Sequence, residues 1–292
     1  MKQMQSCVLC ALARKFSVVK IKGVTLALKK CGAIPIEVDG VLPELVLGRK
    51  AHEISSMKIN VGKEKVDLGD VFEVKCDGDE ALIFEGDLNH VKRIGELMSS
   101  GIIVVRGSAG MHLGERMSGG SVYVDGDIGA RCCCEMRGGT VVVNGNVQAM
   151  LGSPLPGNTK GMRGGTIAVF GSVGARTGEG MRRGVIAVLG DAGDFAGVNM
   201  IAGTIVVFGN LGSNAGGGMK RGSIIALEGV EKIPPTFLYA CTYKPTYLRL
   251  YFNYLRNFGF PVTDEIYEGS FRRYIGDLSS LGKGEMLILE KS

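Results

Sequence analysis

Two kinds of segment alternate through the middle of the chain. Short runs rich in Val and Ile, such as GTIVVFG at 203–209 and GGTVVVNG at 138–145, are typical of strands of about five or six residues. Glycines with Asn, Asp or Ser follow these runs, as in GDAGD at 190–194, and this composition predicts tight turns. The repeating region has no 3.6-residue apolar period, so it does not predict an amphipathic helix.

Methionine marks a strict period in this region. The spacing is 19 residues in every interval except one of 26, which indicates a seven-residue insertion near SPLPGNT at 153–159. The methionines of the period are Met98, Met117, Met136, Met162, Met181, Met200 and Met219.

Three glycine columns keep the same period. The first contains Gly107, Gly126, Gly145, Gly171, Gly190 and Gly209. The second contains Gly110, Gly129, Gly174, Gly193 and Gly212, and the third contains Gly114, Gly152, Gly178, Gly197 and Gly216. Gln148 and Cys133 replace glycine in the second and third columns, so we expect local distortion there. We expect glycine where a corner has no room for a Cβ, and a positive φ at Gly190 and Gly209.

A repeat of nineteen residues is too short for a strand and a full helix. The pattern therefore predicts an all-β solenoid, in which each repeat forms one coil and like residues stack in ladders about 4.8 Å apart. The methionine ladder is expected to fill the interior, because the thioether adapts to irregular gaps.

The flanking sequence predicts a cap at each end. We expect coils over 86–229 and a small N-terminal β cap over 46–85, where VDLGDVFEV at 66–74 alternates. The C-terminal segment, 230–292, contains a predicted helix near 245–258, with Pro245 in its first turn and Gly259 just past its end. Its apolar face contains Leu248, Tyr251, Phe252 and Leu255. This helix either caps the solenoid or docks a partner, and the sequence leaves both open.

Composition and charge exclude several classes of protein. The net charge of +5 is too small to indicate nucleic-acid binding, and no apolar run approaches a membrane span. The first residues lack the features of a secretory signal, so the expected location is the cytoplasm. The eight cysteines are then expected to be reduced and structural. A lone CxxC at Cys7 and Cys10 is only a weak metal motif, and alternation along CCC at 132–134 predicts side chains on opposite faces.

Catalytic residues are hard to find. His52, His90 and His112 lie in no metal-binding pattern and have no convincing nucleophile beside them. Carboxylates such as Asp127, Asp191 and Asp194 occupy predicted turns, where hydrogen bonds to the backbone are enough to explain their presence. We therefore expect no active site and no bound cofactor or metal in this chain.

A basic residue directly follows four of the seven periodic methionines. In a solenoid these residues would stack at one corner, where like charges repel one another. The strip is either a solvated edge or a binding surface for an acidic partner or polyanionic ligand. Its residues are Arg137, Arg163, Arg182, Arg183, Lys220 and Arg221.

Three segments resemble the C subunit of formylmethanofuran dehydrogenase and of the related bacterial formyltransferase/hydrolase complex. They are KRIGELMSSGIIVVRGSAG at 92–110 with the M-x-G-G coils after it, YLRLYFNYL at 247–255 and RRYIGDLSSLGKGEML at 272–287. The resemblance begins near Val46, so residues 1–45 are not covered. It implies a single-stranded right-handed β-helix with GXGXG-type repeats. The runner-up is the similar C-terminal domain of the glutamate synthase large subunit, which is a spacer in ammonia assimilation.

The resemblance also implies partners and a pathway. A formyl group would pass between a furan-type carrier, methanofuran or methylofuran, and tetrahydromethanopterin. The chemistry would lie on other subunits: a metal-dependent amidohydrolase-like subunit, with either a formyltransferase subunit or one that carries a molybdenum or tungsten pterin. This chain would be the non-catalytic subunit of such a complex.

Overall fold

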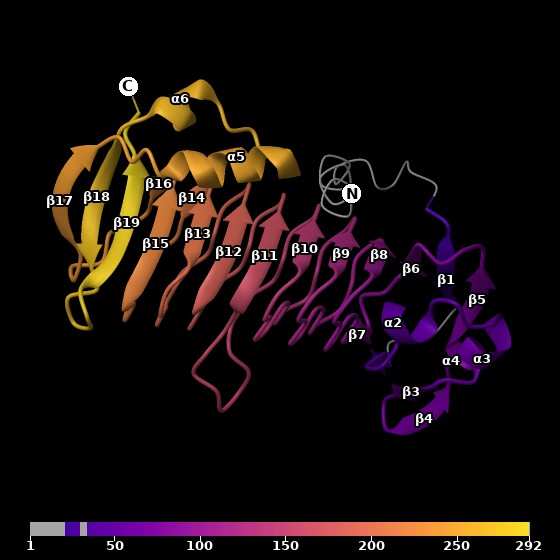
Figure 1. Ribbon diagram of the computed structural model, residues 1–292. Coiled ribbons are helices and arrows are strands. Elements are labelled where there is room, and N and C mark those ends of the chain that lie inside the picture. The colour runs from indigo at the N-terminus through magenta and orange to yellow at the C-terminus, as the bar shows by residue number, and fades with distance from the viewer. Residues whose placement is uncertain (1–20, 30–33, 292) are drawn as a thin grey trace.

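The computed structural model describes residues 21–29 and 34–291, and strands dominate this part of the chain (Figure 1). The protein is thus all-β, as predicted, with few helices. Within the described ranges, the main sheet has thirteen strands, in the order β17 (Leu238–Tyr243), β18 (Phe271–Gly276), β19 (Lys283–Leu289), β15 (Arg221–Ala226), β13 (Thr204–Val207), β12 (Arg183–Val188), β11 (Arg163–Val169), β10 (Thr140–Val143), β9 (Ser121–Val124), β8 (Ile102–Arg106), β6 (Ala81–Glu85), β1 (Gly23–Leu28) and β5 (Phe72–Cys76).

Successive repeats pair in parallel and in register. Ser121 lies beside Thr140, 19 residues on, and Thr140 lies beside Thr166, across the longer interval. The parallel series runs from β1 through β15 to β19, and antiparallel strands close both ends: β5 beside β1, and β18 and then β17 beside β19.

A second contact column links the same repeats away from the main strands. It consists of single parallel bridges that follow the period and join Leu88, Ala109, Ile128, Val147, Val173, Ala192 and Leu211 in turn. The last step continues as β14 (Asn210–Leu211) beside β16 (Gly229–Val230). Backbone hydrogen bonds between corners form a third column, for example from Phe195 N to the Ser213 carbonyl at 2.9 Å. Each repeat is therefore held to the next at three places.

All seven periodic methionines are fully buried in one core, as predicted. The strands beside them are buried on both faces, because side chains alternate between that core and a second one on the outer face of the sheet. In β12, for example, Ile186 and Val188 belong to the first core and Ala187 to the second.

Helix α5 (Leu248–Phe258) lies across part of this outer face (Figure 1). Its buried side chains are Leu248, Phe252, Leu255 and Phe258, which pack in the same cluster as the outward residues of the sheet. The hydroxyls of Tyr254 and Thr166 are 2.9 Å apart and tie the helix to β11. Gly259 follows in a left-handed conformation, and the chain continues to the short helix α6 (Asp264–Glu268). Helix α5 therefore covers part of the sheet, while Leu250 remains exposed to solvent.

The predicted reason for the first glycine column is half right. Gly190 and Gly209 do not have a positive φ, so that part of the prediction is wrong. The space argument holds, because a Cβ on Gly190 would lie 2.4 Å from Ser172 Oγ and one on Gly209 would lie 2.6 Å from the Gly190 backbone. Close stacking of one repeat on the previous one therefore excludes a side chain here.

A fourth glycine column, three residues after each methionine, has the left-handed backbone. Its φ values run from 78° to 110°. In most repeats a Cβ here would strike the terminal methyl of the methionine one repeat earlier, as at Gly184, where Met162 Cε would be 2.7 Å away. The two columns therefore depend on each other. The members of this column are Gly101, Gly120, Gly139, Gly165, Gly184, Gly203 and Gly222.

The two exceptions in the glycine columns do not distort their repeats. Cys133 takes the same left-handed conformation, with φ of 55°, as Gly114 and Gly152 in neighbouring repeats. Gln148 N donates to the Ile128 carbonyl at 3.0 Å, just as Gly129 N donates to the Ala109 carbonyl one repeat earlier. The expectation of local distortion is therefore wrong.

The N-terminal region combines short helices with a small sheet. The helices are α2 (Pro43–Val46), α3 (Ala51–Ser55) and α4 (Leu68–Val71). The small sheet has the order β4 (Glu64–Asp67), β3 (Lys58–Val61), β2 (Ile36–Glu37) and β7 (Val91–Lys92). The segment 66–74 is not one alternating strand, because α4 separates β4 from β5 and buries Leu68 and Val71. β1 and β2, which precede residue 46, pair with strands of this region.

Candidate functional site

The basic strip follows one corner of the stacked repeats. Each basic residue directly after a periodic methionine donates its backbone N–H to the carbonyl of the methionine one repeat earlier, as Arg182 does to Met162 at 2.8 Å and Lys220 does to Met200 at 2.8 Å. Arg137 and Arg163 make the same bond, so all four positions stack. The strip is thus built by the same ladder that positions the methionines.

Five of the six side chains on the strip are exposed and, within the described part of the chain, have no carboxylate at ion-pair distance: Arg137, Arg182, Arg183, Lys220 and Arg221. Arg183 lies directly beside Arg163 in the pairing of β12 with β11. A fold would not place like charges this close for stability, so screening or a ligand must offset their repulsion.

The strip is interrupted in one repeat, and it includes a lysine that the sequence analysis did not identify. Ile201 and Ala202 replace the basic residues in one repeat, so the strip falls into two groups. In the second group, Arg221 lies beside Lys283 in the pairing of β15 with β19. Sequence periodicity could not find Lys283, because β19 returns to the sheet from a distant, non-repeating segment.

Arg163 differs from the rest of the strip because it faces a buried carboxylate. Its Nη2 lies 3.8 Å from Glu135 Oε2, and its Nε is buried without a hydrogen-bond partner. The Glu135 side chain is 3% exposed and also accepts from Arg116 Nε at 3.4 Å and from the Leu155 backbone N–H at 3.3 Å.

Glu135 anchors the seven-residue insertion. Asn158 donates to it from the loop, close to the bond from Leu155. Burial by itself raises the pKa of Glu135, but the hydrogen bonds from Asn158 and Leu155 and the charge of Arg116 outweigh it, so the pKa lies below its usual value. The carboxylate is therefore a structural anion that holds the loop at the basic corner.

The remaining titratable candidates have structural surroundings. His112 Nδ1 lies 2.7 Å from Glu115 Oε2, at hydrogen-bond distance within one corner, and His52 and His90 are exposed. No His, Cys, Asp and Glu cluster in the described ranges could hold a metal ion. No helix in those ranges is both long enough and apolar enough to span a bilayer.

The turn carboxylates join a side-chain ladder that runs along the stack. Asp127 Oδ1 accepts from Asn146 N at 2.6 Å, Asp191 Oδ1 accepts from Asn210 N at 2.7 Å, and Asp194 Oδ1 accepts from Ser213 N at 2.9 Å. Serine and asparagine side chains fill the positions between these aspartates in the same way. These carboxylates therefore accept backbone N–H groups in turns, as the sequence predicted.

The cysteines of the described ranges form no disulfide. Cys132, Cys133 and Cys134 are buried in a turn and not in an alternating strand. The prediction of opposite faces is wrong, because the sulfurs of Cys132 and Cys133 lie 3.4 Å apart. Burial and the hydrogen bond from Ser153 act in opposite directions on Cys134, and burial prevails, raising its pKa to about 12. Cys7 and Cys10 lie outside the described residues.

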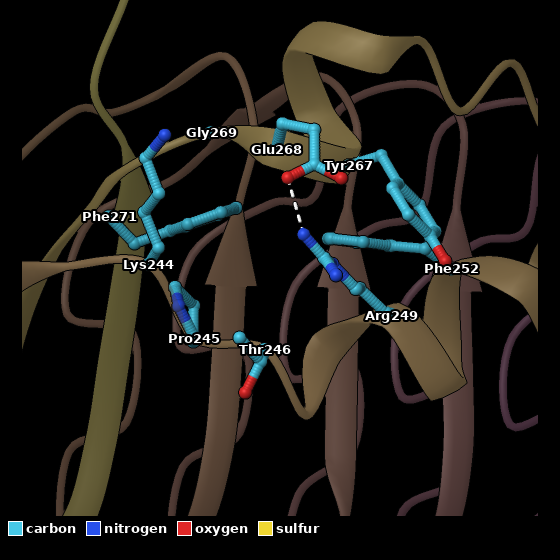
Figure 2. Close-up of a pocket in the computed structure, with 9 residues that line it drawn as sticks. All are labelled: Lys244, Pro245, Thr246, Arg249, Phe252, Tyr267, Glu268, Gly269 and Phe271. Carbon is cyan, nitrogen blue, oxygen red and sulfur yellow. Dashed lines mark hydrogen bonds and ion pairs between the residues drawn. The ribbon is translucent and has the colours of Figure 1, made fainter.

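A small pocket between α5 and α6 shows how the C-terminal helices lock together (Figure 2). Arg249 forms an ion pair with Glu268 and lies 5.2 Å from the centre of the Tyr267 ring. The volume is about 10 Å³, which is room for about one water molecule. This pocket is therefore too small for a substrate-sized ligand.

Comparison with known proteins places these features in a family. No family model matches the chain. A stretch of 95 residues is 35% identical to the C subunit of the tungsten-containing formylmethanofuran dehydrogenase 2 of Methanothermobacter wolfeii, covering 31% of this chain and 35% of that protein. A stretch of 95 residues is also 40% identical to the C subunit of the molybdenum-containing formylmethanofuran dehydrogenase 1 of Methanosarcina barkeri, covering 31% of this chain and 32% of that protein. The match thus spans about a third of the length of these curated relatives.

One solved structure matches a much larger part of the chain. It is the crystal structure of the formyltransferase/hydrolase complex of Methylorubrum extorquens with methylofuran, in which one chain superposes with a TM-score of 0.85 and 35% identity. The superposition covers 91% of this chain and 100% of that chain. The chain described here therefore belongs to the C-subunit family of formylmethanofuran dehydrogenases and formyltransferase/hydrolase complexes.

Proposed function

We propose that this chain is the structural, non-catalytic subunit of a multisubunit complex that transfers formyl groups between a furan-type carrier and tetrahydromethanopterin. The observation that carries the proposal is the match over the whole of a chain from the formyltransferase/hydrolase complex. The chain that matches over its whole length comes from a formyltransferase/hydrolase complex, which supports the hydrolase form of the complex. A glutamate-synthase-type spacer is not favoured, because these relatives belong to formyl-group enzymes.

The fold proposed for this role is a single-stranded right-handed β-helix over 86–229, between an N-terminal cap (46–85) and a C-terminal segment (230–292). Three columns of parallel contacts between successive repeats support it. The handedness follows from the strong preference of parallel strand crossovers for the right-handed form. A rod of this kind offers a rigid, extended surface for assembling other subunits.

The expected partners are the amidohydrolase-like and formyltransferase subunits, or a pterin-bearing subunit in a dehydrogenase. In this proposal the metal and the pterin belong to those subunits, and the furan-type carrier is bound by the complex. Within the described ranges no cluster of His, Cys, Asp and Glu could hold a metal ion, which supports placing the metal on another subunit.

Co-expression with the neighbouring genes, followed by affinity purification through this chain, tests the proposal. We expect formyl transfer and formyl-carrier hydrolysis in the purified complex and no turnover by this chain alone, because it contains no positioned acid–base set. Turnover by the isolated chain that is abolished in His112→Gln or Glu115→Gln would contradict the structural role.

The basic strip is proposed to bind an acidic surface of a partner subunit or the polyanionic carrier. We expect the triple variant Arg182→Glu, Arg183→Glu, Arg221→Glu to weaken assembly or carrier affinity by about tenfold or more at low salt. The effect should shrink as salt rises, because exposed charges are screened. Titration of reconstituted complexes with long and short carrier chains separates the two partners.

The control variant, Lys63→Glu with Lys65→Glu, reverses exposed charges on the turn before β4 and on β4 itself. It should leave assembly and carrier affinity unchanged. If the strip variant also has no effect at low salt, the strip is a solvated edge.

A further inference from the structure

β17 forms one edge of the main sheet and is uncovered (Figure 1). Five of its six residues are exposed, including Leu238 at 59% and Tyr239 at 57%. It pairs with β18 on one side, and in the described ranges no strand pairs with its other side. The backbone groups on that side are therefore available to another strand.

The edge is apolar as well as open. β17 has the sequence LYACTY, with no charged residue and no proline. A bulge at Ala240 shifts its register with β18 but adds no charge. Leu278 and Leu281, which are 51% and 55% exposed, belong to the turn after β18, and Leu278 N donates to the Thr236 carbonyl beside the start of β17. An exposed strand edge and exposed leucines therefore lie at the same end of the sheet.

The opposite edge of the same sheet is built differently. β5 carries Glu73 and Lys75, whose side chains form an ion pair at 3.1 Å. Charged side chains on an edge strand are a common protection against unwanted pairing, because an added strand would have to desolvate them. One edge thus carries this protection and the other does not, which indicates that β17 has a partner.

We propose that β17 pairs antiparallel with β17 of a second copy of this chain, so that two copies join their main sheets across a twofold axis. The absence of charge selects this partner, because a strand without charged side chains meets no like charge when it lies beside itself. A twofold contact between identical edges also closes the assembly at two copies, with both β17 edges covered. Each copy then brings its exposed leucines toward the end of the other copy's strand.

This inference does not depend on the proposed function, because it concerns the full chain alone. Sedimentation of the purified chain should show a dimer at micromolar concentrations. Tyr239→Lys and Thr242→Lys should each raise the dissociation constant of the dimer by about tenfold or more, because each places a charge on the paired edge. Circular dichroism should confirm that both variants keep the wild-type fold.

Cross-linking locates the contact, because the exposed cysteines of the described ranges lie one on each edge, Cys241 on β17 and Cys76 on β5. The short thiol cross-linker bismaleimidoethane should produce a covalent dimer in the wild type and in Cys76→Ser but not in Cys241→Ser. A chain that sediments as a monomer throughout this range, or a dimer that both lysine variants leave intact, overturns the proposal.

Discussion

Gly184→Val should lower the free energy of unfolding by about 3 to 5 kcal/mol, or prevent folding altogether. Gly184 has a φ of +104°, a conformation that β-branched residues rarely adopt. A Cβ at this position would also lie 2.7 Å from both the Gly165 carbonyl oxygen and Met162 Cε. Backbone strain and steric clash therefore add at this one residue. Chemical denaturation followed by circular dichroism measures the resulting loss in the free energy of unfolding.

Gly157→Val is the matched control for this variant. Gly157 lies in the exposed insertion with a φ of +86°, and a Cβ there would meet nothing within 4 Å. It carries the backbone cost alone, about 1 to 2 kcal/mol. Equal losses in the two variants would mean that stacking against Met162 contributes nothing. If Gly184→Val does not fold, Gly184→Ala provides a measurable comparison.

Glu135→Ala should lower the free energy of unfolding by about 2 to 4 kcal/mol, because it leaves Arg116, Arg163 and the Leu155 N–H without their buried acceptor. It should also release the insertion at 153–159, which limited proteolysis would detect as new cleavage there. Glu179→Gln is the control, since Glu179 pairs with Arg176 at a more exposed corner without an insertion. That pair contributes about 1 kcal/mol or less.

The same carboxylate predicts a dependence on pH. Because the pKa of Glu135 is lower in the folded protein than in the unfolded chain, its ionised form adds stability. That contribution is complete above the unfolded value of about 4.3 and disappears as the pH falls through the folded value. The stability difference between wild type and Glu135→Gln should therefore shrink in acid, and a difference that stays constant down to pH 3 would contradict this account.

The repeating part of the fold was predictable because one period fixes both the strands and the interior. The methionine spacing alone places all seven side chains in the core. The left-handed column was also within reach, since Gly101 and its six equivalents recur with the same spacing. The prediction assigned positive φ to Gly190 because it treated every glycine column as a turn, whereas stacking distance decides there.

Contacts made by non-repeating segments were not predictable from the period. Asn158 of the insertion binds Glu135 beside the basic corner, Lys283 joins that corner from β19, and neither contact follows the spacing. The packing of α5 on the main sheet was only partly predictable. Its apolar face indicated that the helix is buried on one side but not which surface it packs against. Such contacts depend on where distant segments return, and a single sequence carries little information about that.

The seven extra residues between β10 and β11 give the protein a ready site for new sequence. Their presence leaves the neighbouring ladders in register, since Val141 still pairs with Ile167 and Val147 still bridges to Val173. The tip of the loop is exposed around Gly157, between Leu155 and Asn158, the two loop residues that bond Glu135. A fluorescent protein or an affinity peptide grafted at this tip should therefore be carried without disturbing the stack, giving a label for the chain within a larger assembly.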